Sequence, residues 1–179
     1  MEYTEQFKEK LLDSLIQSCT QQGWLDGTLP ASPDIDAQWQ RFAPSYYGDS
    51  VREFNAYPEY ALACAGYLGM AVACFWDKDW PRYMDEPYSR YQGARGFDDM
   101  DDHITGTILD DPDFAVRAMQ SCSAAAYHAL RKESAEPGSV TAYKLFLVTV
   151  EAMYRIGAAL QLYRLGYRFE AVNVRNPGA

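Results

Sequence analysis

Apolar residues recur every three or four positions along most of the chain. This spacing places them on one side of an α-helix, which completes a turn in 3.6 residues. The clearest stripe near the N-terminus consists of Phe7, Leu11, Leu12, Leu15, Ile16 and Cys19. Alternating β-branched and polar residues, the pattern typical of strands, are almost absent. The sequence therefore predicts an all-α fold.

Helix boundaries follow from the ends of these stripes and from Gly, Pro and Asp residues beside them. The expected helices cover residues 4–22, 35–42, 58–76, 97–109, 112–132 and 140–165, and residues 43–50 are expected to form a loop. Asp110 or Asp111 is expected to cap the fifth helix, with Pro112 in its first turn. The prediction is a single all-α domain, residues 1–179, built as a bundle of five or six helices.

The segment from Tyr60 to Trp76 contains no charged residue. It is shorter than the roughly 20 apolar residues that span a membrane, and acidic residues flank it. We therefore expect a central buried helix and no membrane contact. Small residues four positions apart (Ala61, Ala65, Gly69 and Ala73) give this helix one smooth face. That face could pack against another helix of the chain or form a homodimer.

The overall composition limits the classes of partner that the protein is expected to bind. Apolar residues make up 48% of the chain, and the net charge is −9. An acidic surface repels phosphate backbones and attracts basic proteins, so we expect a basic protein partner and no nucleic acid. The four cysteines are widely separated, and the N-terminus lacks the pattern of a signal peptide. A cytoplasmic location is expected.

The most conspicuous motif is an aspartate cluster, Asp98-Asp99-Met100-Asp101-Asp102. It resembles the DDxxD motif of trans-prenyl diphosphate and terpene synthases, which are also all-α. The resemblance implies that Asp98 and Asp102 hold Mg²⁺ or Mn²⁺, which would bridge to a diphosphate. The two residues lie four apart and share a helix face, and His103 could add a ligand.

A second interpretation of the cluster is favoured. Those enzymes need a second aspartate-rich motif on a facing helix, whereas Asp110–Asp113 contains a proline and begins a helix. Aspartates near a helix N-terminus accept hydrogen bonds from free amides and offset the helix dipole. We therefore expect helix capping and no cofactor. A metal-dependent hydrolase or lyase of a phosphorylated substrate stays as the alternative.

Residues 77–113 hold eleven of the 25 acidic residues and several aromatic ones. Aromatic rings anchor protein interfaces, while carboxylates attract a basic partner. The predicted partner surface consists of Trp80, Tyr83, Asp85, Glu86, Tyr88 and Tyr91. In the alternative, the aromatic side chains point inward and leave an ordinary acidic face.

Glu151 stands inside a strongly apolar segment. A carboxylate in such a place requires a partner, and Arg155 is one helical turn further on. We expect an ion pair between them at the edge of the core. Alternatively, Trp76, Glu151, Tyr154 and Arg155 line a pocket for a small ligand.

No nucleophile elbow, P-loop or dinucleotide fingerprint occurs in the sequence. The sequence therefore favours a non-enzymatic, cytoplasmic, protein-binding domain, such as an adaptor, an inhibitor or an immunity-type protein. The metal-dependent enzyme and the small-ligand-binding bundle remain the alternatives.

Overall fold

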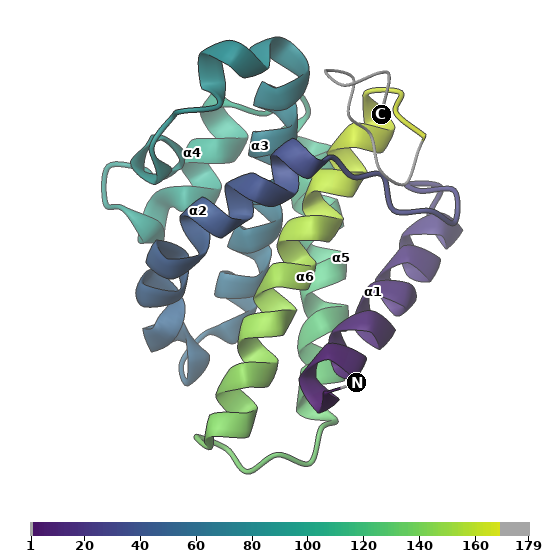
Figure 1. Cartoon of the computed structure of the whole chain (residues 1–179), viewed down its shortest axis with the longest axis vertical. Helices are drawn as coiled ribbons and strands as arrows, with labels where there is room; N and C mark the ends of the chain where they lie inside the picture. Colours follow the sequence, from purple (N-terminus) through teal and green to yellow (C-terminus); the bar gives the residue numbers. More distant parts are fainter. Residues whose placement is uncertain (1, 169–179) are drawn as a thin grey trace.

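The computed structural model describes residues 2–168, which form six α-helices and three short 3-10 helices (Figure 1). Their bounds are α1 Tyr3–Gln21, α2 Pro33–Ser50, η1 Val51–Phe54, α3 Pro58–Tyr83, η2 Tyr88–Tyr91, η3 Phe97–Asp99, α4 Met100–Thr107, α5 Pro112–Arg131 and α6 Val140–Arg164. This range contains no strand, only an isolated bridge between Gly93 and Gly96. The predicted all-α bundle is confirmed.

Helices α3 and α6 make the most extensive contact between two elements of the bundle. Their backbones touch where both helices carry glycine. A Cβ atom on Gly69 would lie 2.1 Å from the carbonyl oxygen of Tyr154, and one on Gly157 would lie 2.0 Å from that of Gly66. The small-residue face of α3 is thus used inside the chain, which gives the homodimer left open by the sequence no support.

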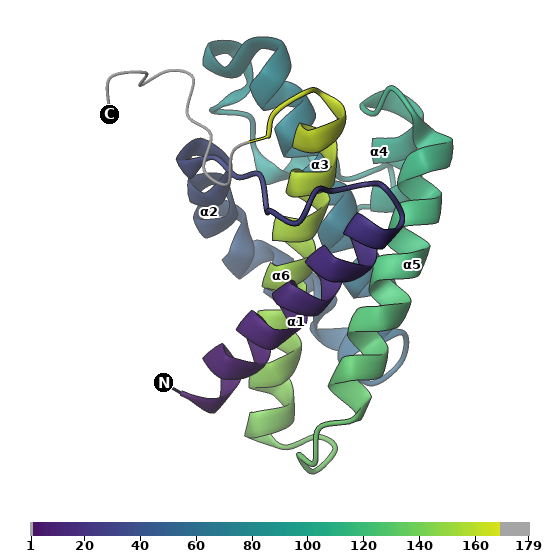
Figure 2. The same ribbon diagram turned by 90° about the vertical axis from the view of Figure 1, so that its right-hand side faces the viewer.

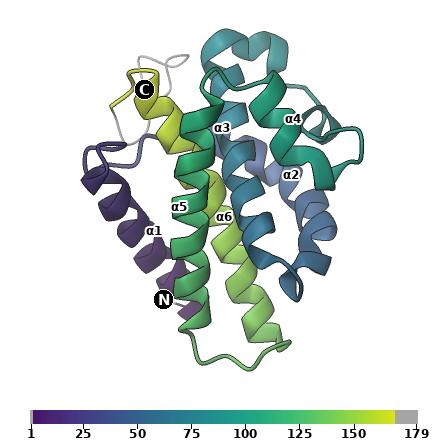
Figure 3. The same cartoon turned by 180° about the vertical axis from the view of Figure 1, so that it is seen from behind.

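The other helices surround this pair. Helix α1 runs obliquely across α6 and α5 (Figure 2), and α5 covers the back of α3 and α6 (Figure 3). Helix α2 contacts α3 and α6 on the remaining side, and α4 packs on α3 and α5. Of the predicted N-terminal stripe, Ile16 is half-buried and the other five residues are buried. The helical periodicity therefore identified the core-facing side of α1.

Two helices have the length and the apolar composition of a membrane span, Pro58–Tyr83 and Val140–Arg164. In each, 78% of the most apolar window is buried inside the protein. These helices form the core that the other four cover, so their apolar character is accounted for by packing within the chain.

Helix α2 extends well past the predicted boundary, and the expected loop over residues 43–50 is wrong. Pro44 lies inside this helix, although proline removes one helical hydrogen bond. The stripe of Trp39, Phe42 and Tyr46 continues across Pro44 and is buried against the core. The Tyr46 hydroxyl also donates to the carbonyl of Ala61 in α3. Tertiary packing here outweighs the local signal of the proline.

Helix α3 contains a kink near its C-terminal end. Asp79 adopts an extended conformation (φ −170°, ψ 79°), and a short helical turn containing Pro81 follows. The predicted end at Trp76 is close to this kink. The extra turn carries Trp80 and Tyr83 back onto the core, where both are buried.

Candidate functional site

The predicted partner surface is not an aromatic patch. Trp80, Tyr83 and Tyr91 are buried, and Tyr88 is half-buried. The Tyr83 ring stacks on Phe75 with a centroid distance of 4.1 Å. Burial of large rings is strongly favourable, so the segment folds with these side chains inward. The prediction that they anchor a partner is wrong for the buried rings, and the inward-pointing alternative holds.

The acidic members of that surface remain accessible to different degrees. Asp85 is exposed, and Glu86 is half-buried and lies 3.8 Å from Arg90. Arg41 of α2 donates to the carbonyls of Met84 (2.6 Å) and Glu86 (2.9 Å). These contacts fix the turn after α3 to α2, so Asp85 and Glu86 belong to a structural connection.

The proposed metal ligands do not converge. Asp98 forms an ion pair with Arg52 at 2.6 Å, Asp102 is exposed, and the Nε2 atom of His103 lies 3.0 Å from the carbonyl oxygen of Arg90. Among residues 2–168, no three His, Cys, Asp or Glu side chains form a group suited to a metal ion. The aspartate cluster therefore gives no geometric support for a magnesium-diphosphate site.

The capping interpretation of the cluster is only partly right. All four aspartates do fall in the first turns of η3 and α4. Asp99 is the N-cap residue of α4, yet its side chain makes no capping hydrogen bond to that helix within residues 2–168. Its carboxylate instead accepts from the backbone amide of Arg95 (2.8 Å) and from the Arg95 guanidinium (2.7 Å). This pairing lowers the pKa of Asp99. By contrast, the predicted cap of α5 is confirmed, because Asp111 accepts from the amide of Phe114.

Three of the four predicted pocket residues line the same surface depression. Glu151, Tyr154 and Arg155 of α6 face α2 across a volume of about 210 Å³. We call this depression the α2–α6 notch; it is lined by Asp36, Trp39, Gln40, Glu151, Tyr154 and Arg155. Trp76 does not line it, and its Nε1 atom donates to Asp34 at 3.1 Å.

The expected ion pair between Glu151 and Arg155 is not formed. Glu151 accepts from Lys8 of α1 at 3.0 Å. The two side chains are both largely shielded, with exposed fractions of 15% for Lys8 and 25% for Glu151. Desolvation opposes the charge on Lys8, but Glu151 and Glu5 outweigh it and raise the pKa of the ammonium group. The sequence could not show this pair because 143 residues separate its members.

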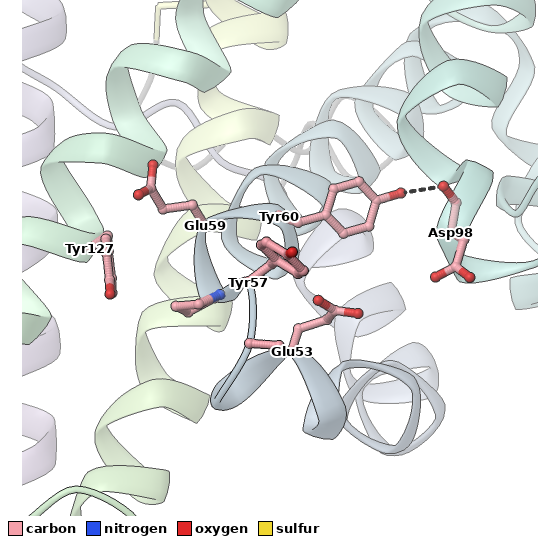
Figure 4. Close-up of a pocket in the computed structure, with 8 residues that line it drawn as sticks. Glu53, Tyr57, Glu59, Tyr60, Asp98 and Tyr127 are labelled. Carbon is pink, nitrogen blue, oxygen red and sulfur yellow. Dashed lines mark hydrogen bonds between the residues drawn. The ribbon is translucent and has the colours of Figure 1, made fainter.

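A surface depression lies at the end of α3 opposite the kink. We call it the tyrosine groove; it is lined by Glu53, Ala56, Tyr57, Pro58, Glu59, Tyr60, Asp98 and Tyr127, with a volume of about 490 Å³ (Figure 4). The sequence pattern did not indicate it. Its residues come from η1, the segment between η1 and α3, α3 itself, η3 and α5, so only the fold brings them together.

The groove combines aromatic rings with carboxylates. Tyr57 is 72% exposed, the highest fraction among the large hydrophobic side chains that are exposed in residues 2–168. Figure 4 shows its ring between the side chains of Glu53 and Glu59. Glu53 and Asp98 both pair with Arg52, at 3.5 Å and 2.6 Å. Glu59 is exposed and makes no ion pair within residues 2–168.

One tyrosine fixes the wall of the groove. The Tyr60 hydroxyl donates to the backbone carbonyls of Phe97 (2.9 Å) and Asp98 (2.8 Å), which attaches η3 to α3. Burial raises the pKa of Tyr60, with further contributions from Cys64 and Asp101. This hydroxyl therefore stays protonated and acts as a donor at neutral pH, which holds Asp98 beside the groove.

A second pocket of about 380 Å³, with apolar and polar walls, adjoins the groove and shares Ala56, Pro58 and Tyr127 with it. Its other lining residues are Phe54, Asn55, Leu130, Arg131, Glu133, Ala135, Pro137, Gly138, Ala142, Leu145 and Phe146. Together the two depressions offer an acidic, tyrosine-lined groove and a neighbouring pocket with apolar side chains in part of its wall.

Relationships to other proteins do not help to choose among these sites. Comparisons of the chain with protein-family models, curated proteins and solved structures found no match.

Proposed function

We propose that this protein binds a basic, partly apolar segment of another protein in the tyrosine groove and the adjoining pocket. The observation that carries the proposal is the exposed Tyr57 ring beside the unpaired carboxylate of Glu59 at the mouth of the groove. An aromatic face next to a carboxylate suits a Lys or Arg side chain, because ring and charge both attract the cation.

The adjoining pocket supplies the apolar half of the recognition. Phe54, Leu130 and Ala135 are only half-buried there, so their apolar surface contacts water. Covering this surface with an apolar side chain of the partner would be favourable in proportion to the area removed from water. The preferred segment therefore has a bulky apolar residue close to one or more basic residues.

The charge of the whole chain supports the same class of partner. A net charge of −9 raises the association rate of basic proteins and lowers that of acidic ones. An adaptor, an inhibitor and an immunity-type protein would all use such a surface, and the identity of the partner decides among them. The proposal thus keeps the binding function favoured by the sequence and moves its surface to a different place.

Selection of binding peptides from a random displayed library tests the proposal. Enriched peptides are expected to pair an apolar residue with Lys or Arg, and fluorescence anisotropy then measures their dissociation constants. Glu59→Gln and Tyr57→Ala are each expected to weaken binding at least fivefold, whereas Glu9→Gln, which removes an exposed carboxylate on α1, should not. Added salt should weaken binding further. Enrichment of acidic peptides, or no effect of either groove variant, would overturn the proposal.

The α2–α6 notch supports a second candidate, the small-ligand-binding bundle. Three residues predicted from the sequence to line a pocket do line this one, together with Asp36 of α2. It shares no lining residue with the groove, so the two functions do not exclude each other.

A further inference from the structure

The α2–α6 notch contains an arginine without a partner. Arg155 is half-buried, yet it makes no ion pair and donates no hydrogen bond within residues 2–168. A partly desolvated guanidinium is stabilised by an anion, and its planar fork matches a carboxylate with two parallel hydrogen bonds. The neighbouring Glu151 cannot fill this role freely, because Lys8 already holds its carboxylate at 3.0 Å.

Across the notch, α2 contributes the solvent-exposed carboxylate of Asp36. Asp36 forms no ion pair within residues 2–168, although the charge of Arg155 acts on it. Partial desolvation raises the pKa of Asp36, while Arg155 opposes this shift and Glu151 adds to it. The two opposite charges thus line the same depression without forming a direct salt bridge.

The remaining walls of the notch are rigid and aromatic. Trp39 is 4% exposed, and the rings of Trp39 and Tyr154 lie 4.9 Å apart. The Tyr154 hydroxyl donates to the carbonyl of Ile35 at 2.7 Å, so it is not available to a ligand. The polar chemistry of the notch therefore comes chiefly from Arg155 and Asp36, with Gln40 exposed at its rim.

We propose that the α2–α6 notch binds a small zwitterion, an α-amino acid or a compound with the same pair of groups. The carboxylate of the ligand would pair with Arg155 and its ammonium group with Asp36, while its side chain would lie against Trp39. The volume of about 210 Å³ suits a ligand of the size of an amino acid. An ion with only one of the two groups would satisfy one unpaired charge and leave the other, so both groups are required for tight binding.

Thermal unfolding measures this selectivity directly. The protein is melted with each of the common amino acids in turn, because a ligand that binds only the folded state raises the melting temperature. The best amino acid is then compared with its two single-group analogues: for alanine, these are propionate and ethylamine. We expect a saturable rise with the amino acid and at least tenfold weaker binding of either analogue.

Variants identify the site. Arg155→Gln and Asp36→Asn are each expected to abolish the shift, while Arg117→Gln, which removes an exposed arginine of α5, should retain it. Melting without ligand verifies that each variant is folded. No shift with any amino acid, or an equal shift in wild type and Arg155→Gln, would overturn the proposal; the latter result would indicate general stabilisation by solute. Peptide binding in the tyrosine groove does not involve Arg155, so either proposal can fail alone.

Discussion

A single hydroxyl group joins two elements that the groove needs. Tyr60 donates to both carbonyls at the start of η3, and the phenylalanine variant would leave these acceptors without that donor. Tyr60→Phe is expected to lower the free energy of unfolding by about 1–2 kcal/mol. Urea denaturation measures the loss. Tyr127→Phe serves as the control, because the Tyr127 hydroxyl makes no hydrogen bond within residues 2–168, and its stability should change little.

The ion pair between Asp99 and Arg95 predicts a dependence of stability on pH. The folded state lowers the pKa of Asp99, chiefly through its hydrogen bonds with Arg95. The contribution to stability is therefore complete above the unfolded pKa of about 3.9 and is lost as the pH falls through the lower folded value. Asp99→Asn should unfold at lower urea concentration than wild type at pH 7, and the difference should shrink below about pH 4. A difference that stays constant with pH would contradict this role of the charge.

The close contact between α3 and α6 limits which side chains fit where the two helices cross. Gly69→Ala would place a Cβ atom 2.1 Å from a backbone oxygen of α6, which cannot move away independently of its helix. The expected cost is about 1–3 kcal/mol of unfolding free energy. Gly48→Ala in α2 is the matched control, because its Cβ would meet no atom within 4 Å. That variant should be neutral or slightly stabilised, since alanine favours helices. Equal effects of the two substitutions in thermal melts would contradict the close contact.

The elements that the sequence predicted best are those with long, uninterrupted apolar stripes. Helices α1, α5 and α6 begin and end within a residue or two of the expected positions. The predicted range of α2 was too short because Pro44 is a strong local signal for the end of a helix. The burial of Tyr46 beyond this proline depends on α3, which the local sequence does not show. Local signals predict a boundary only where no distant element stabilises the continuation.

The candidate sites were less predictable than the helices. The pair of Glu151 and Arg155 led to the notch, because a charge inside an apolar stripe is visible in one dimension. Asp36 was not predicted as a pocket residue because it lies on another helix, and no spacing rule connects it with Glu151 or Arg155. The tyrosine groove was missed for the same reason, since Tyr57 and Tyr127 meet only in the folded chain. Conversely, the acidic aromatic segment was prominent in the sequence but contributes mainly to the core.

Thiol reactivity reports whether the whole bundle stays closed. Cys19, Cys64 and Cys122 are buried, and half-buried Cys74 lies with its Sγ atom 3.6 Å from the carbonyl oxygen of Ile108. Burial also raises the pKa of Cys64 and Cys74, which lowers the thiolate fraction that reacts. We expect at most one thiol to react with a chromogenic disulfide in the native protein. All four should react in denaturant, which calibrates the assay. Rapid reaction of all four without denaturant would show that the helices separate readily.

The contact between α1 and α6 has a consequence for the time course of synthesis. Residues 3–21 leave the ribosome well before the helix that covers much of their apolar stripe, residues 140–164. At typical elongation rates of about 5–20 residues per second, the stripe waits on the order of ten seconds for its partner. During that interval Leu11 and Leu15 lack the neighbours that bury them in the finished bundle. The bundle can therefore be completed only after α6 emerges.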